Sequence, residues 1–157
     1  MNEETKKAYF YLIRILTKRD YSRYKLEQKL RERGYTRQAI DESIAEIISL
    51  NYLREDNYIE ARIKGFMHKN CSMTYIRSKL AEEFLEVEIS LIEEVFVEHG
   101  ISEKDQITRI IHKKLPPTPS NELDYDSRIK SENKILRYLY GKGHQIGTAR
   151  AILKSIF

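Results

Sequence analysis

The stretch DYSRYKLEQKLRERG, residues Asp20–Gly34, decides the fold, because its pattern returns twice further along the chain. The pattern is a serine, two aliphatic residues at four-residue intervals, and a closing residue four positions later. The serines are Ser22, Ser72 and Ser131. The aliphatic pairs are Leu26 with Leu30, Ile76 with Leu80, and Ile135 with Leu139. The closing residues are Gly34, Phe84 and Gly143.

Each copy of this pattern predicts one short helix. The serine hydroxyl can accept hydrogen bonds from the free N–H groups of a first helical turn. Two aliphatic residues four positions apart form a narrow apolar stripe on one side of a helix. A closing glycine can adopt the left-handed backbone that ends many helices. Three copies in one chain indicate a repeat protein.

Helical periodicity extends over the rest of the chain, and no stretch has a convincing strand pattern. The sequence predicts an all-α fold of three tandem three-helix repeats, stacked into an elongated array. The repeats occupy residues 1–52, 53–100 and 101–157, and the third contains a Pro-rich loop over residues 115–126. The expected helices are Thr5–Lys18, Ser22–Arg33, Thr36–Asn51, Glu55–Lys69, Ser72–Glu83, Val87–His99, Ser102–Leu115, Ser127–Tyr140 and Ile146–Ile156.

Composition favours a cytoplasmic protein without a membrane segment. Hydrophobic residues make up 41% of the 157 residues and charged residues 33%. No apolar run approaches the roughly 20 residues that a membrane-spanning helix needs. The first residues lack the pattern of a signal peptide. Cys71 is the only cysteine, so no internal disulfide can form.

Charge is unevenly distributed along the chain. Residues 1–70 carry 15 Lys and Arg against 11 Asp and Glu, residues 71–115 carry 6 against 9, and residues 116–157 carry 7 against 4. A purely non-specific DNA-binding protein is usually more basic throughout. Basic ends around an acidic middle therefore indicate a partner that is partly protein and partly nucleic acid.

Three segments of the chain carry a more specific pattern than the periodicity alone. The first segment is Arg19-Asp20-Tyr21-Ser22 with Leu26, Lys29-Leu30 and Gly34-Tyr35. The second is Asn51-Tyr52-Leu53 with Asp56, Tyr58-Ile59 and Ala61-Arg62. The third is Lys134-Ile135-Leu136-Arg137-Tyr138-Leu139 with Lys142-Gly143-His144. In this order and at this spacing, the three segments resemble the repeats of the RecX family. Two features depart from the family, since residues 69–75 carry few charges and Phe84 replaces the usual glycine.

The resemblance implies a curved, monomeric, non-enzymatic modulator of the bacterial recombinase RecA. Such a protein binds the RecA filament on single-stranded DNA and inhibits its growth, ATP hydrolysis, strand exchange and repressor cleavage. It would act in homologous recombination, DNA repair and the SOS response, with weak direct binding to nucleic acid. Two alternatives stay open: a helix-turn-helix DNA-binding protein, and a helical-repeat scaffold that does not depend on DNA.

A basic stripe beside the aliphatic pairs is the candidate contact face for the filament. Cations can neutralise phosphates, and tyrosine rings can stack on bases. An ordinary solvated helix surface is the competing interpretation. We expect the stripe and the residues beside it to face the partner: Arg19, Arg23, Lys25, Lys29, Arg33, Lys79, Lys134, Tyr138 and Lys142.

Other patterns do not indicate catalysis or a cofactor. The acidic block Glu82–Asp105 holds nine carboxylates and one lysine, and it is either a solvated face or a contact for a basic surface. His68 and Cys71 could supply only half of a metal site. Residues 141–147 contain three glycines but follow a helix and lack the Lys-Ser/Thr ending of a phosphate loop. We therefore expect no catalytic residue, no metal and no cofactor.

Overall fold

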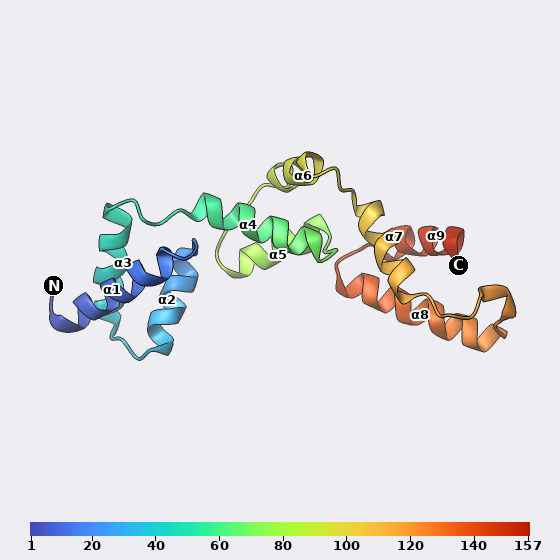
Figure 1. Cartoon of the computed structure of the whole chain (residues 1–157), viewed down its shortest axis with the longest axis horizontal. Helices are drawn as coiled ribbons and strands as arrows, with labels where there is room; N and C mark the ends of the chain where they lie inside the picture. The colour runs from blue at the N-terminus through green and yellow to red at the C-terminus, as the bar shows by residue number, and fades with distance from the viewer. The chain divides into compact units, whose positions relative to one another are not determined.

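The computed structural model describes all 157 residues, and it confirms the all-α prediction. Nine α-helices and one short 3₁₀ helix follow one another without a strand (Figure 1). None of the helices is long and apolar enough to span a membrane. The helices are α1 (Glu3–Leu16), α2 (Arg23–Glu32), α3 (Arg37–Ser49), α4 (Glu55–His68), α5 (Met73–Glu82), α6 (Ile89–Glu98), α7 (Glu103–Lys114), η1 (Ser120–Glu122), α8 (Tyr125–Gly141) and α9 (Ile146–Ile156).

The chain forms two compact units. Unit 1 comprises residues 1–62 together with residues 82–85, and unit 2 comprises residues 63–81 and 86–157. The chain thus leaves unit 1 within α4, returns to it at the end of α5, and leaves again. This division into two units does not test the boundaries of the three sequence repeats, which stay a prediction.

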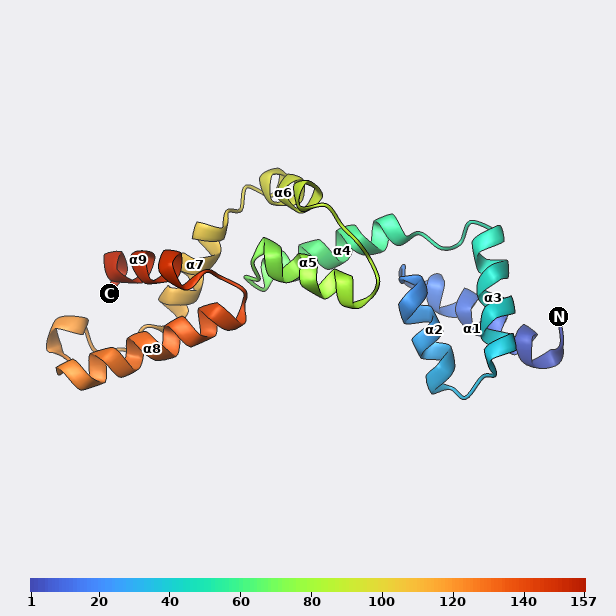
Figure 2. The same cartoon turned by 180° about the vertical axis from the view of Figure 1, so that it is seen from behind.

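Both units contain a helical core of the kind that the sequence pattern predicts. In unit 1, α1, α2 and α3 pack around an aliphatic cluster that includes Leu12, Leu26 and Ile44. In unit 2, α7, α8 and α9 enclose a cluster that includes Ile111, Ile135 and Leu153. Figure 2 shows the same helices from behind. The six aliphatic residues of the repeated pattern, from Leu26 to Leu139, are all at most 1% exposed, so their assignment to the core is confirmed.

Two of the three predicted serine caps are present. The Ser22 hydroxyl accepts from the backbone N–H of Lys25 at 3.1 Å, and the Ser72 hydroxyl accepts from that of Tyr75 at 3.2 Å. The third prediction is wrong, because Ser131 lies inside α8. That helix begins earlier, where the Asp124 carboxylate accepts from the N–H of Ser127 at 2.7 Å.

The early start of α8 also corrects the predicted proline loop. Residues 125 and 126 belong to the first turn of α8, and residues 120–122 form the short η1 helix. An aspartate is among the strongest residues at a helix N-cap, and Asp124 occupies that position here. The irregular segment is therefore shorter than residues 115–126.

The three closing residues share a left-handed backbone although only two of them are glycines. The φ angles are 83° at Gly34, 87° at Gly143 and 59° at Phe84. Glycine adopts this conformation without strain, whereas a side chain is disfavoured there. Phe84 keeps the geometry of the repeat, and its side chain is 80% exposed.

A buried glutamine joins α7 to the end of α4 within unit 2. Gln106 is fully buried, and its side-chain amide donates to the carbonyl of Met67 at 3.0 Å and to that of Cys71 at 2.7 Å. The last carbonyls of a helix have no partner within the helix, so such donors stabilise its end. Gln106 thus acts as a C-terminal cap for α4, although it is distant from that helix in the sequence.

Replacing this glutamine should measurably weaken unit 2. We expect Gln106→Leu to lower the free energy of unfolding by about 2 kcal/mol, because the Cys71 carbonyl would lose its donor and the Met67 carbonyl would keep only the N–H of Asn70. Urea unfolding followed by circular dichroism measures the change. The exposed Gln38, which lies on α3 and bonds only Glu42, provides the matched control Gln38→Leu, which should cost less than about 0.5 kcal/mol. Equal effects of the two substitutions would contradict the capping role.

Candidate nucleic-acid and partner interface

Cations of the predicted stripe in unit 1 lie against tyrosine rings. The Nζ atom of Lys29 is 5.2 Å from the centroid of the Tyr21 ring, and the Arg19 guanidinium is 4.7 Å from the same centroid. The guanidinium of Arg33 lies 4.0 Å from the centroid of the Tyr11 ring. Such contacts hold a cation in place while leaving its charge uncompensated. These three residues can therefore present positive charge to a phosphate.

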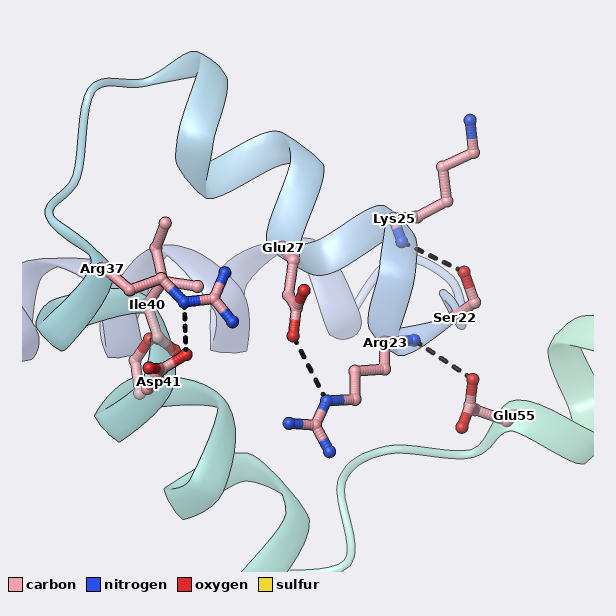
Figure 3. Close-up of polar contacts among 9 residues, drawn as sticks. Ser22, Arg23, Lys25, Glu27, Arg37, Ile40, Asp41 and Glu55 are labelled. Atoms are coloured by element: carbon pink, nitrogen blue, oxygen red, sulfur yellow. Dashed lines mark hydrogen bonds and ion pairs between the residues drawn. The ribbon is translucent and has the colours of Figure 1, made fainter. Parts of the chain in front are cut away.

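Two other predicted cations of unit 1 contact carboxylates instead. The guanidinium of Arg23 lies 3.3 Å from the Glu27 carboxylate, and its backbone N–H donates to Glu55 at 3.2 Å, as Figure 3 shows. The Nζ atom of Lys25 lies 3.8 Å from a carboxylate oxygen of Glu83. Lys25 and Arg23 thus have structural roles that the sequence pattern did not reveal.

Glu83 is the centre of a polar cluster that sequence reasoning missed. It is 6% exposed, and it accepts a hydrogen bond from the Tyr58 hydroxyl at 2.6 Å. The guanidinium of Arg62 lies 3.7 Å from its other oxygen. Burial and the neighbouring carboxylate raise the pKa of Tyr58 to about 12, so this hydroxyl stays a donor at neutral pH. The available signal was that Glu83 is the only acid at the nine equivalent positions beside the aliphatic pairs, which are 25, 29 and 33, then 75, 79 and 83, then 134, 138 and 142.

The stripe in unit 2 repeats the pairing of cation and ring. The Nζ atom of Lys79 is 5.4 Å from the centroid of the Tyr75 ring. Lys142 and Lys114 both approach the Tyr138 ring, with Nζ atoms 5.6 and 4.3 Å from its centroid. Sequence reasoning missed Lys114, which precedes the proline loop and comes from a different helix. Tyr138 is 41% exposed, so its ring can also meet a partner.

The predicted residues divide between the two units. Arg19, Arg23, Lys25, Lys29 and Arg33 belong to unit 1, whereas Lys79, Lys134, Tyr138 and Lys142 belong to unit 2. Lys134 is exposed on α8. Within each unit cations lie beside tyrosine rings, and surfaces that bind single-stranded nucleic acid combine these two kinds of side chain. That the two sets form one continuous face stays a prediction.

The sparse metal-ligating and nucleophilic groups do not assemble into a site. His68 and His99 approach ring to ring, with centroids 5.8 Å apart. No group of three or more His, Cys, Asp or Glu residues is arranged to hold a metal ion. Burial raises the pKa of the Cys71 thiol, which makes it a poor nucleophile at neutral pH.

Comparison with known proteins identifies the class of protein fold to which this helical architecture belongs. A family model described as RecX, first three-helix domain, matches residues 8–46, which cover α2 and most of α1 and α3. The fold matches the crystal structure of RecX from Lactobacillus salivarius with a TM-score of 0.64 and 21% sequence identity, over 99% of this chain and 100% of that chain. The chain therefore has the helical-repeat fold of RecX.

Curated sequences agree with this assignment. The Regulatory protein RecX of Haemophilus influenzae strain 86-028NP is 24% identical over 136 residues, which are 87% of this chain and 86% of that protein. The Regulatory protein RecX of Vibrio cholerae strain O395 is 31% identical over 71 residues, which are 45% of this chain and 47% of that protein. The predicted resemblance to the RecX family is thereby confirmed along most of the chain.

Proposed function

We propose that this protein is a negative modulator of RecA, which binds the RecA filament on single-stranded DNA and inhibits its growth. Inhibition of ATP hydrolysis, strand exchange and repressor cleavage would follow from a shortened filament. The observation that carries this proposal is the match to regulatory proteins named RecX over 87% of the chain. The relatives are named as regulators, in keeping with a binding role without catalysis.

The paired cations and rings support a contact with the DNA strand of the filament. A strand of DNA is a dense line of negative charge, and bases stack on aromatic rings. Several weak contacts distributed over one chain can together bind tightly. A protein of this kind needs no single deep pocket.

The direct test measures ATP hydrolysis by the RecA of the same organism on single-stranded DNA. We expect substoichiometric protein to lower the steady-state rate. An unchanged rate at equimolar, folded protein would overturn the proposed function. Equal binding to RecA with and without DNA would instead favour a scaffold, and tighter binding to one duplex sequence would favour a helix-turn-helix DNA-binding protein.

A pair of charge reversals tests the stripe itself. We expect Lys29→Glu with Lys142→Glu to weaken binding to the RecA–DNA filament at least tenfold, because a repelling charge replaces a cation in each unit. For each phosphate that the variant no longer neutralises, the slope of log affinity against log salt should fall by about 0.7. Filament binding is measured across a salt series, with circular dichroism on each variant.

The matched control is Lys18→Glu with Lys154→Glu. These two lysines are exposed, whereas Lys29 and Lys142 are half-buried; they lie one in each unit and stand outside the stripe. Equally weakened binding by the two variants would show that only net charge matters. Lys25 is a poor choice for this experiment, since its reversal would place a second carboxylate beside buried Glu83.

A further inference from the structure

A groove between α8 and α9 has no role in the proposed function. It has a volume of about 790 Å³. Aliphatic side chains from both helices line it, namely Ile129, Leu136 and Ile146. Tyr140 also lines the groove, and its side chain is 69% exposed. Such an apolar surface is a candidate for contact with a protein.

The charges around this groove are positive and uncompensated. The charged residues that line it are one acid, Asp126, and three cations, Lys130, Arg137 and Arg150. None of the three cations forms an ion pair. Lys130 and Arg137 are seven residues apart on α8, so they share one side of that helix. The stripe residue Lys134 is a neighbour of both cations on α8, whereas Tyr138 lies farther around the helix and Lys142 follows its last residue. None of these three residues lines the groove, which the sequence pattern did not indicate.

The outer face of α6 has the opposite character. Glu93, Glu94 and Glu98 are exposed, and none of them forms an ion pair. Val97, which lies between these acids, is 79% exposed, and Leu91, at the edge of the face, is 43% exposed. The inner face of α6 already supplies Ile92, Val95 and Phe96 to the core, so the outer aliphatic residues are not needed for folding.

We propose that the outer face of α6 in one copy of the chain docks into the α8–α9 groove of a second copy. Three unpaired acids would meet three unpaired cations, and the exposed Val97 and Leu91 would cover the aliphatic floor. Both surfaces belong to unit 2, where they lie well apart (Figure 1). One copy therefore cannot satisfy both with its own residues, whereas two copies can. This inference does not depend on the proposed function.

The aliphatic lining favours this occupant over nucleic acid, since the three cations alone would also attract phosphates. Tyr140 is the one aromatic residue of the lining, whereas Ile129, Leu136 and Ile146 match the aliphatic side chains of an acidic face. Complementary charges at the rim add attraction that salt weakens. The monomer predicted from the family resemblance is the competing outcome.

Sedimentation equilibrium of the full chain tests the proposal, at low and at high salt and over a wide concentration range. We expect reversible self-association that weakens as salt rises. Lys130→Glu with Arg137→Glu should lower the association constant about tenfold or more, since two attractions become repulsions. Glu94→Lys with Glu98→Lys on α6 should have the same effect.

Mixing the two reversed variants gives the decisive result. Each variant alone repels its own copies, but the acidic groove of one matches the basic α6 of the other. The mixture should therefore regain association near the wild-type level. The control Lys104→Glu with Lys113→Glu makes the same charge change at two exposed positions of α7, which do not line the groove, and should associate like wild type.

Three outcomes would overturn the proposal. One is a wild-type chain that stays monomeric at low salt up to about millimolar concentration. Another is self-association that neither reversed variant alters, with folding verified by circular dichroism. The third is a mixture that associates no better than its components, which would assign both surfaces to a different partner.

Discussion

Gly143→Ala is expected to destabilise unit 2 by about 3 kcal/mol. A left-handed backbone at φ 87° disfavours any L side chain, at a cost of about 1–2 kcal/mol. The added Cβ atom would also overlap the Ser72 hydroxyl and lie 2.6 Å from the Cβ of Tyr75. Overpacking of this kind costs about 1–3 kcal/mol more.

The overlap arises because two loops are held together at this point. The N–H of Ser72 donates to the carbonyl of Lys142 at 2.9 Å. The buried ring of His144 bonds the carbonyl of Asn70 through Nε2 at 2.9 Å. Neither loop can move away from a new methyl group without breaking one of these bonds.

Gly34→Ala is the matched control for this prediction. Gly34 has nearly the same backbone, with φ 83°, but nothing lies within 4 Å of an added Cβ. Only the backbone cost should remain, about 1–2 kcal/mol. Urea unfolding of both variants isolates the contribution of the overlap. Equal destabilisation by the two substitutions would show that the two loops separate easily.

Glu83→Lys is expected to destabilise unit 1 by about 3 kcal/mol or more. The buried carboxylate is within 4 Å of the charged groups of Lys25 and Arg62, and it accepts from Tyr58. Removing one partner of a buried ion pair typically costs about 3–5 kcal/mol. Lys25 and Arg62 are 37% and 39% exposed, so water compensates them in part and the lower end of that range applies.

Exposed Glu86, three residues further along, provides the control Glu86→Lys. This substitution makes the same charge change and should alter stability by no more than about 0.5 kcal/mol. Thermal and urea unfolding measure both variants. If Glu83→Lys unfolds like the control, the cluster contributes no more than a surface ion pair.

The sequence predicted much of the fold because local signals agree with the core. Aliphatic spacing identified the buried side of every helix in the repeated pattern, including Leu26, Ile76 and Ile135. The third helix cap was misplaced, because Ser131 fits the repeat but Asp124 is the residue at the helix start. A repeat pattern predicts only the features that its copies have in common. The third copy lies within a longer helix, α8, which begins six residues before Ser131.

The candidate site was only partly predictable, since its contacts join residues distant in sequence. Periodicity placed Lys29 and Lys142 beside the aliphatic stripe. Periodicity could not show that Lys25 lies against Glu83, 58 positions away. Nor could it show that Lys114 and Lys142 approach the same ring, that of Tyr138. Such pairs depend on how helices pack together, and no single helix contains the information.

The route of the chain has an evolutionary consequence. Residues 82–85 belong with the first 62 residues, although residues 63–81 between them belong to unit 2. A deletion of the second sequence repeat, residues 53–100, would remove Glu83 together with Tyr58 and Arg62 and leave Lys25 of unit 1 without its carboxylate partner. Gain or loss of a repeat by duplication or deletion would need compensating substitutions in unit 1. The number of repeats in such a protein should thus change less readily than in arrays whose modules end where their sequence repeats end.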